Sequence, residues 1–270
     1  LLNPRQLSIR SYRHDKENPS SLSYNPVNAI YEDAYGTLWV GTVEGGLNRK
    51  ERNSEDFTHY TREHGGLSHN SVSALTSDAD NHLWIGTWGG GLNLLDLKAP
   101  RQILEVISSQ TGGGFPINFI GVLNYDPINE GIWIGANQGL YFYDPVKKEI
   151  TAPLPDKAAE NIHGCIGSII DKEGKLWVGC LEGVYIIDLH SRSSKGEFQY
   201  RHLNYKLDDP SSRLIEKITC FYQGKDGTLW LGSNGYGIYQ RKIDAQGKEQ
   251  FISYSTAQGL PNNSVRGILE

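Results

Sequence analysis

Histidines and carboxylates are the residues of this chain that could bind a metal or move a proton, but their spacing forms no metal motif. His59 and His64 are five residues apart, yet a strand pattern ends between them, so they do not share a helix face. His69 and His163 occupy corresponding connecting segments of two similar stretches of sequence. A zinc site needs more ligands than this pair supplies. We therefore expect no metal site, no catalytic residue and no cofactor in this chain.

The cysteines give a second possible chemistry, thiol oxidation. The chain has three, Cys165, Cys180 and Cys220, which are too few for a disulfide-built scaffold and form no CxxC pair. Cys165 and Cys180 flank a turn at 171–174, so pairing of the two strands around that turn makes these cysteines face each other. Because cross-strand geometry suits a disulfide poorly, we expect free thiols.

Aromatic rings on loops are the residues best suited to recognising a ligand. Trp88 interrupts a glycine-rich stretch and is expected as an exposed ring, and Tyr236 occupies a comparable place. Such a ring can stack on a sugar while amides and carboxylates bond its hydroxyls. The other ligand-binding candidates are Glu44, His69, Asn118, Asn137, Gln138, His163, Glu182, Arg213 and Asn234. The alternative is that these rings only cover neighbouring loops.

These loops are positioned by a phrase of Trp, an aliphatic residue and Gly that occurs five times. Successive Trp residues are 45, 49, 44 and 53 residues apart, a spacing typical of a repeat architecture. The phrase contains Trp39, Trp84, Trp133, Trp177 and Trp230, with Gly41, Gly86, Gly135, Gly179 and Gly232 two residues further on. Because every copy has them, we interpret these residues as scaffold: the indole fills space between units and the glycine allows close backbone approach.

Each copy is predicted to contain four short strands. In the second copy, alternating residues indicate strands at 70–77 and 82–87, followed by strands at 91–96 and 101–107. No segment is a convincing helix. Four strands in about 45 residues describe a β-propeller blade, so we predict an all-β fold of four-stranded antiparallel blades. The five complete blades are expected at 26–62, 70–108, 117–153, 163–204 and 215–255.

Both ends of the chain carry part of a further copy. Residues 7–12 match a lone fourth strand and residues 263–270 match a lone first strand. We therefore expect residues 1–270 to form a single propeller fragment of a larger array, taken as seven-bladed. Its ring would be open or closed by a partner. The chain lacks Met altogether, which suggests that it is cut from a longer precursor.

The turn between the first and second strands carries a recurring carboxylate. The residues concerned are Asp33, Asp126, Asp171 and Asp226. An Asp side chain can accept hydrogen bonds from the backbone N–H groups that follow it. We therefore expect these residues to cap turns rather than to form catalytic pairs, and to lie on the face opposite the candidate recognition loops.

Charge and hydropathy exclude other classes of function. With 26 basic and 31 acidic residues, the net charge of −5 provides no basic face for nucleic acid. The apolar runs are too short to span a bilayer, and the first residues do not resemble a signal peptide. We expect no nucleic-acid partner.

The combined phrase D-x-x-G-x-L-W-[IV]-G-T-x-x-G-G-L-N, present at Asp33–Asn48, resembles the two-component regulator propeller repeat. The stretch from Asp80 to Asn93 is similar. The resemblance implies the periplasmic, sensing part of a bacterial protein in which propellers precede a β-sandwich, a membrane helix and a histidine kinase or diguanylate cyclase. It also implies an oligosaccharide ligand from polysaccharide breakdown, contacts with other propeller and β-sandwich segments of the parent chain, and a homodimer.

Two other functions remain open at this stage. Seven-bladed lyases of the virginiamycin-inactivating type also carry Trp- and Gly-rich repeats, and that resemblance implies a His with a divalent metal near the axis. Acidic neighbours of His69 or His163 would favour this hypothesis. The third hypothesis is a structural dimerisation platform, with the ligand bound elsewhere in the parent protein.

Overall fold

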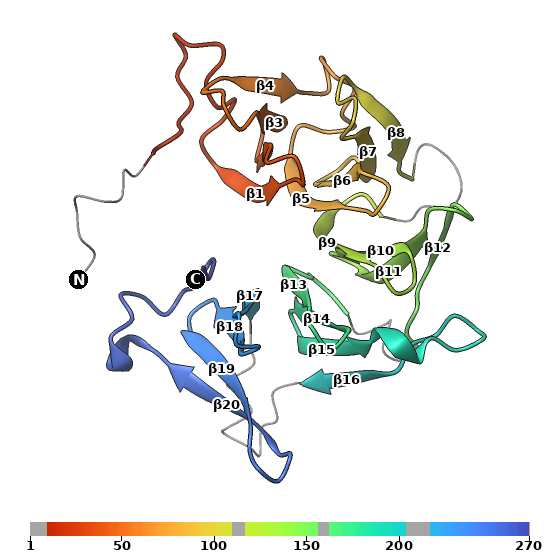
Figure 1. The fold of residues 1–270 in the computed structure, drawn as a ribbon, viewed down its shortest axis with the longest axis vertical. Helices are drawn as coiled ribbons and strands as arrows, with labels where there is room; N and C mark the ends of the chain where they lie inside the picture. Colours follow the sequence, from red (N-terminus) through yellow and green to blue (C-terminus); the bar gives the residue numbers. More distant parts are fainter. Residues whose placement is uncertain (1–9, 110–116, 156–161, 204–216, 270) are drawn as a thin grey trace.

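The structure is a computed structural model that describes residues 10–109, 117–155, 162–203 and 217–269. Its strands form five four-stranded antiparallel sheets, and in each sheet the strands follow the chain in simple up-and-down order. The sheets are arranged in an arc around a central axis, as Figure 1 shows. The predicted β-propeller architecture with five complete blades is therefore confirmed.

The strand bounds define the blades. The first blade contains β1 (Val27–Glu32), β2 (Leu38–Thr42), β3 (Leu47–Lys50) and β4 (Phe57–Tyr60). The second contains β5 (Val72–Ser77), β6 (His82–Thr87), β7 (Leu92–Asp96) and β8 (Ile103–Ile107). The third contains β9 (Ile120–Asp126), β10 (Gly131–Ala136), β11 (Gly139–Asp144) and β12 (Glu149–Thr151). The fourth contains β13 (Gly167–Ile170), β14 (Lys175–Cys180), β15 (Gly183–Asp188) and β16 (Tyr200–Leu203). The fifth contains β17 (Ile218–Gln223), β18 (Leu229–Ser233), β19 (Ile238–Ile243) and β20 (Glu249–Tyr254).

Helix is nearly absent from the described residues. Two one-turn 3-10 helices, η1 (Leu189–Ser191) and η3 (Thr256–Gln258), follow strands of the fourth and fifth blades. No helix in the described ranges has the length and hydropathy needed to cross a membrane. The fold therefore rests on sheet packing alone.

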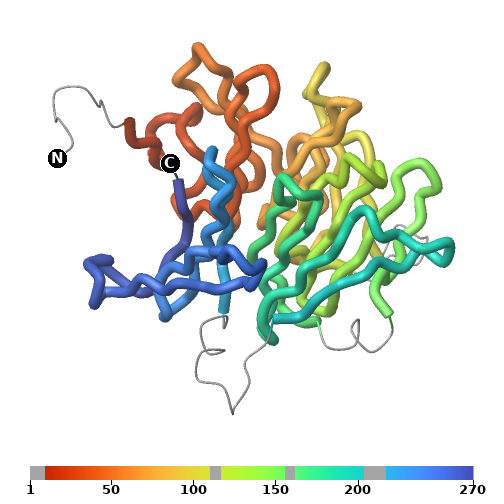
Figure 2. The backbone as a smooth tube through the Cα atoms, turned by 60° about the horizontal axis from the view of Figure 1, so that its bottom comes forward, coloured from red at the N-terminus to blue at the C-terminus, as the bar shows by residue number. Residues whose placement is uncertain are grey.

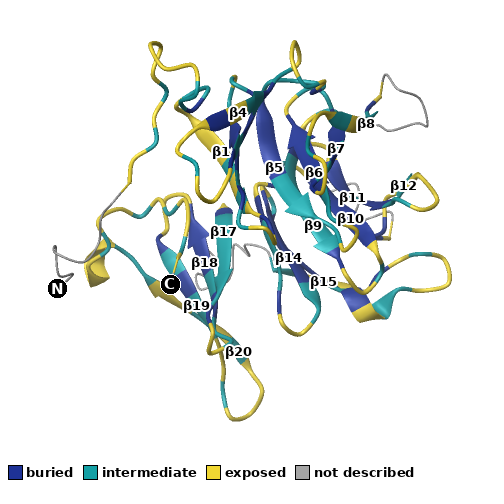
Figure 3. Ribbon diagram, turned by 45° about the horizontal axis from the view of Figure 1, so that its top comes forward, coloured by how far each residue is buried: buried dark blue, intermediate teal, exposed yellow. Residues whose placement is uncertain are grey.

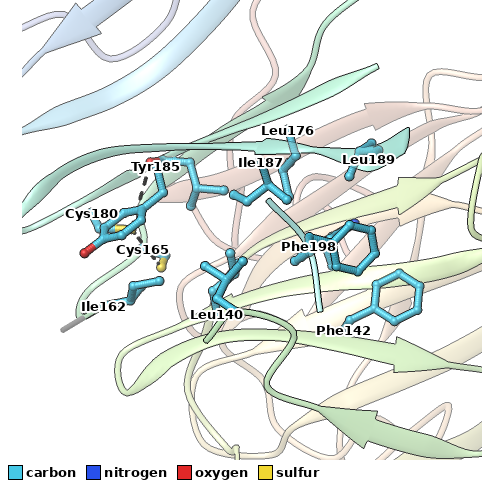
Figure 4. Packing of buried hydrophobic residues seen from close by; sticks show 13 residues of the cluster. Leu140, Phe142, Ile162, Cys165, Leu176, Cys180, Tyr185, Ile187, Leu189 and Phe198 are labelled. Atoms are coloured by element: carbon cyan, nitrogen blue, oxygen red, sulfur yellow. Dashed lines mark hydrogen bonds between the residues drawn. The ribbon is translucent and has the colours of Figure 1, made fainter. Parts of the chain in front are cut away.

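The core lies between neighbouring blades, where the repeat indoles are buried. Trp39 of the first blade belongs to one cluster with Val72, Leu83 and Ile85 of the second. Trp133 packs in the same way with residues of the fourth blade, part of which Figure 4 shows around Phe142 and Phe198. Figure 3 shows the middle strands of the blades as the most buried. Packing by the repeat Trp residues is what joins one sheet to the next.

A carboxylate in the first turn of four blades holds the indole as well as the turn. Asp33 Oδ1 accepts hydrogen bonds from the backbone N–H groups of Tyr35 and Thr37, both at 2.9 Å. Its Oδ2 accepts the indole N–H of Trp39 at 2.8 Å. The same bond, which we call the Asp–Trp clasp, joins Asp78 to Trp84 at 2.8 Å, Asp126 to Trp133 at 3.0 Å and Asp171 to Trp177 at 2.7 Å.

The fifth blade departs from this pattern: Asp226 caps its turn, as predicted, but does not hold the indole. Gly224 occupies the place of Asp33: its N–H bonds Thr228 O, and its carbonyl accepts Gly227 N–H. Asp226 is exposed and bonds Thr228 instead. Because only four residues separate Asp226 from Trp230, against six between Asp33 and Trp39, its carboxylate caps the turn without forming a clasp.

The glycine after each repeat Trp lies against the next blade, as predicted. A Cβ added at Gly41 would lie 2.5 Å from Val72 Cγ1, and one at Gly86 would lie 2.6 Å from Ile120 Cγ2. At Gly179 it would lie 2.4 Å from the carbonyl oxygen of Ile218. A side chain at these positions would push the blades apart.

The lone strands predicted at the two ends do not form in the described residues. Residues 7–9 lie outside the described ranges, and 10–12 are not in a strand. In 263–269, Ser264 makes one isolated bridge with Asn234, and no strand follows. The C-terminal segment lies between the first and fifth blades (Figures 1 and 2). A strand requires a hydrogen-bonded neighbour along its length, whereas the backbone of this segment bonds the fifth blade at Asn263 and Val265 alone.

Candidate functional site

One face of the ring is formed by the loops between second and third strands and by the connections between blades. We call it the rim. Gly89 N–H bonds Asn118 O of the next blade at 2.8 Å, and Gly235 N–H bonds Asn263 O at 3.1 Å. Gly164 N–H, just before the fourth blade, bonds Asn137 O of the third at 3.2 Å. These backbone bonds link loops of successive blades, and the clasped turns lie at the opposite ends of the same second strands.

A central cavity of about 790 Å³ opens among the blades. Of the predicted ligand-binding residues, it brings together Trp88 and Asn137. Phe119, Gly164, Cys165 and Ile166 add to the same wall. The first strands supply the rest of the lining, so the cavity follows the propeller axis.

The sequence analysis missed the residues that face this axis. In the first, second, third and fifth blades the pairing of first and second strands shifts by one residue, for example between Val27 and Ala29, and the extra residue lines the cavity. The corresponding residues along the chain, which we call the axial positions, are Asn28, Ser73, Gly121, Ile166, Thr219 and Arg266. In the first, second, third and fifth blades, the axial residue directly follows the residue that begins the first strand's contact with the second. That offset is the signal that could have identified them.

Several axial positions have a structural task. Ser73 Oγ donates to Ile120 O of the next blade at 2.6 Å, and Thr219 Oγ1 donates to Val265 O at 2.7 Å. At Gly121, an added Cβ would lie 2.1 Å from Cys165 O. These residues join blades at the axis. Arg266 is exposed, makes no ion pair within the described part of the chain, and is the charged residue among those lining the cavity.

Trp88 is held on the cavity wall with its ring partly open to solvent. Its backbone forms an isolated antiparallel bridge with Phe119, and its N–H bonds Ser71 O at 2.9 Å. The side chains of Trp88 and Phe119 are 46% and 54% exposed, and Ile166 is 45% exposed. Two aromatic rings and one aliphatic side chain from three successive blades therefore line one cavity without being buried.

The structure brings His163 and Glu182 together on the rim. Glu182 Oε1 lies 2.9 Å from His163 Nδ1, and Oε2 accepts the His163 backbone N–H at 3.1 Å. Glu182 O also bonds His202 Nε2 at 3.0 Å. His69 behaves differently, because its Nδ1 accepts the N–H of Ser71 at 3.0 Å within its own loop. In the described ranges, no three His, Cys, Asp or Glu side chains gather as a metal site would require.

The remaining candidates are spread around the rim. Glu44 is exposed and hydrogen-bonds Tyr24, which raises the pKa of that phenol. Asn118 bonds Ser109 with its side chain, and its carbonyl oxygen accepts Gly89 N–H. Asn234 Oδ1 accepts a bond from Ser264. Gln138 and Tyr236 are exposed at the tips of their loops, and Arg213 lies outside the described residues.

Comparison with solved structures shows the fold. The extracellular domain of BT4673 from B. thetaiotaomicron, described as a hybrid two component system, superimposes with a TM-score of 0.66 at 21% identity, over 88% of this chain and 31% of that one. That of BT3049 from the same organism gives 0.56 at 18% identity, over 92% and 42%. Virginiamycin B lyase from Staphylococcus aureus gives 0.58 at 15% identity, over 88% and 73%. The chain spans less than half the length of either extracellular domain.

The sequence comparisons concern the repeats themselves. A search of curated proteins finds no match. The family model for the two component regulator propeller matches three segments. The first two contain the clasped turns and the second strands of the first and second blades. The third ends at Gly235, after the second strand of the fifth blade. The chain is therefore a β-propeller that carries two-component regulator propeller repeats, at residues 21–44, 66–89 and 214–235.

Proposed function

We propose that this chain is the extracytoplasmic sensor module of a bacterial two-component signalling protein and that it binds an oligosaccharide on the rim. The repeats support the first part, because their family is that of two component regulators. Similar folds in the extracellular domains of BT4673 and BT3049 support a place outside the cytoplasm, which we take as the periplasm. Catalysis would lie in another part of the parent protein, a histidine kinase.

The observation that carries the ligand proposal is the exposed Trp88–Phe119 wall of the central cavity. Aromatic rings left half-exposed in a concave site offer faces on which the apolar side of a sugar can stack. Asn137 and Asn28, which line the same cavity, carry amides that can bond sugar hydroxyls. The residues that line this cavity differ from blade to blade, as a recognition site requires, whereas scaffold residues recur in every blade.

Titration of the chain with a panel of oligosaccharides by isothermal calorimetry tests this proposal. We expect one class of oligosaccharide to bind, and Trp88→Ala to weaken that binding at least 10-fold, because a ring–sugar stack is lost. Tyr35→Ala is the matched control, since Tyr35 is a 54% exposed aromatic in the turn on the opposite face. It should bind as the parent does.

Two outcomes would contradict the ligand proposal. If no oligosaccharide releases heat with either this chain or the intact ectodomain, the propeller serves as a dimerisation platform rather than as the reader. If an oligosaccharide binds equally well to Trp88→Ala, the Trp88–Phe119 wall of the cavity is not the binding site. For signalling, we propose that ligand binding shifts the packing of two protomers in a homodimer, because the ring itself is densely packed.

One observation favours a second function, a lyase of the virginiamycin-inactivating type. His163 has the acidic neighbour that such chemistry requires, at 2.9 Å, and virginiamycin B lyase has a similar fold. A lyase needs further metal-binding groups near this pair. Incubation of a streptogramin B with the chain and Mg²⁺ distinguishes the two functions: ring opening that is lost in His163→Ala supports the lyase, and an intact streptogramin supports the sensor.

A further inference from the structure

Two buried thiols lie in contact inside the fourth blade. Cys180 ends β14 and Cys165 lies two residues before β13, and their sulfur atoms are 3.1 Å apart (Figure 4). The side chains are 2% and 0% exposed, for Cys165 and Cys180 respectively. The predicted contact of these cysteines is found, but not as a cross-strand pair, because Cys165 lies before β13 and Ile170 pairs with Leu176. Both thiols are free in this structure. No other pair of cysteines in the described residues is arranged this way, because Cys220 lies on β17 beside Val265 O.

We propose that Cys165 and Cys180 form an oxidisable pair that closes to an intramolecular disulfide in the presence of a low-molecular-weight disulfide. One thiolate attacks a sulfur of the oxidant and expels one oxidant thiol. The second thiolate then attacks the mixed disulfide, forms the Cys165–Cys180 bond and expels the second oxidant thiol. Two protein thiols lose two electrons and two protons, and one oxidant disulfide becomes two thiols.

The surroundings determine when this reaction can occur. The pair belongs to an apolar cluster with Leu140, Ile162 and Tyr185. The hydrogen bond with Cys165 and burial raise the pKa of the Cys180 thiol, so its thiolate is scarce in the folded protein. Oxidation should therefore be slow in the folded chain and fast while the chain refolds. Cys165 also lines the central cavity, but at 2% exposure it is shielded from an oxidant while the chain is folded.

The bond would fix a functional part of the rim. Residues 163–165 precede β13, and the hairpin after β14 carries Leu181 and Glu182. These segments already meet through Leu181 N–H to His163 O at 3.0 Å and through the His163–Glu182 contact at 2.9 Å. A disulfide between residues 15 apart would hold both segments together when these weaker bonds open. Oxidation would therefore protect the His163–Glu182 pair from local opening.

Thiol counting on the full chain tests the proposal. The chain is unfolded in urea, refolded either with oxidised and reduced glutathione or with a phosphine reductant, unfolded again under acid quench and labelled with N-ethylmaleimide. Intact mass should show three labels after reductive refolding and one after oxidative refolding, with the remaining label on Cys220. Three labels under both conditions would overturn the proposal. So would a disulfide that includes Cys220 in peptide mapping.

Variants and a second measurement separate the bond from its effect on the rim. Cys220→Ser should take two labels when reduced and none when oxidised, whereas Cys180→Ala should take two labels in both conditions. Hydrogen exchange then compares the reduced and oxidised parent chain. The Leu181 amide should exchange at least 10-fold more slowly in the oxidised form. Equal exchange would contradict protection of the rim, whatever ligand the cavity binds.

Discussion

The first four blades and the fifth blade contain the same Trp but hold it differently. Trp39, Trp84, Trp133 and Trp177 are 0–2% exposed, and each donates its indole N–H to a turn carboxylate. Trp230 is only half-buried, and Gly224 stands where that carboxylate would be. The comparison shows that a turn-capping Asp has a second role: it fixes the ring that packs against the next blade.

The fifth blade is joined to the fourth by a largely buried carboxylate, whereas the Lys148–Glu105 ion pair between the third and second blades is more exposed. Glu249 on β20 forms ion pairs with Arg241 on β19 and with Arg201 on β16, both at 2.7 Å. The Arg241 guanidinium also lies 5.1 Å from the centre of the Trp177 ring. We call these residues the Glu249 cluster. The outer strands of these two blades therefore depend partly on ionisable groups, in addition to the buried apolar cluster around Trp177 and Leu231.

Replacement of the repeat Trp by Ala should give the largest difference in stability between the first four blades and the fifth. Trp133→Ala removes a fully buried ring and leaves a cavity, so we expect a loss of about 3–5 kcal/mol in the free energy of unfolding. Trp230→Ala removes a half-buried ring and should cost less than half as much. Urea unfolding followed by circular dichroism measures both. Equal losses for the two variants would show that the clasp and the deeper burial make no difference.

Acidification should weaken the fifth blade before the others. Burial alone would raise the pKa of Glu249, but its bonds with Arg201 and Arg241 hold that pKa below its ordinary value. Its stabilising effect is therefore complete above the unfolded pKa of about 4.3 and is lost as the pH falls through the lower folded value. Glu249→Gln should cost about 2 kcal/mol at pH 7.

The pH dependence of that variant provides its check. The difference in the free energy of unfolding between parent and Glu249→Gln should shrink as the pH falls below 4, because the parent then loses the same ion pairs. Glu55→Gln is the control, since the Arg10–Glu55 pair is about two-thirds exposed at both residues. A constant difference across this range would mean that the cluster acts through shape and not through charge.

The smallest expected effect is the gain from rebuilding a clasp in the fifth blade. Gly224→Asp places a carboxylate six residues before Trp230, and the added Cβ would meet only a movable Asp226 side-chain oxygen closer than 3.7 Å. We expect a gain of about 1 kcal/mol from the new hydrogen bonds. Gly224→Ala is the control for the loss of glycine flexibility. If both variants gain equally, the carboxylate forms no clasp with Trp230.

The repeat made most of the fold predictable, and the missing clasp in the fifth blade shows the limit of that reasoning. Strand alternation and the Trp–Gly phrase fix the number and order of the sheets, because both reflect burial between blades. The clasp depends on the number of residues between the Asp and the Trp. Asp78 lies six residues before Trp84 and forms a clasp, whereas Asp226 lies only four before Trp230 and does not, although both are in turn-like sequences. Residues 263–269 have strand-like alternation, but pairing depends on a neighbour that alternation does not reveal.

The candidate site was predictable in its loops but not at its axis. Exposure of Trp88 followed from its place in a glycine-rich loop. The axial residue Asn28 was not identified, because a bulge has no strong sequence signature. Arg266 was not identified because it lies in a segment that forms no strand. Contact of His163 with Glu182 depends on two loops meeting in space, 19 residues apart. Loop composition alone does not show that meeting.

The central claim is that residues shared by all copies form the scaffold, whereas the rim loops, which differ between blades, are available to bind a ligand. Trp84 and Trp88 lie four residues apart in one blade and allow the most direct test. Equilibrium urea unfolding of the two alanine variants should show a loss of about 3–5 kcal/mol for Trp84→Ala, which is 2% exposed. Trp88→Ala should stay within about 1 kcal/mol of the parent. A comparable loss for Trp88→Ala would make that ring scaffold and contradict the account.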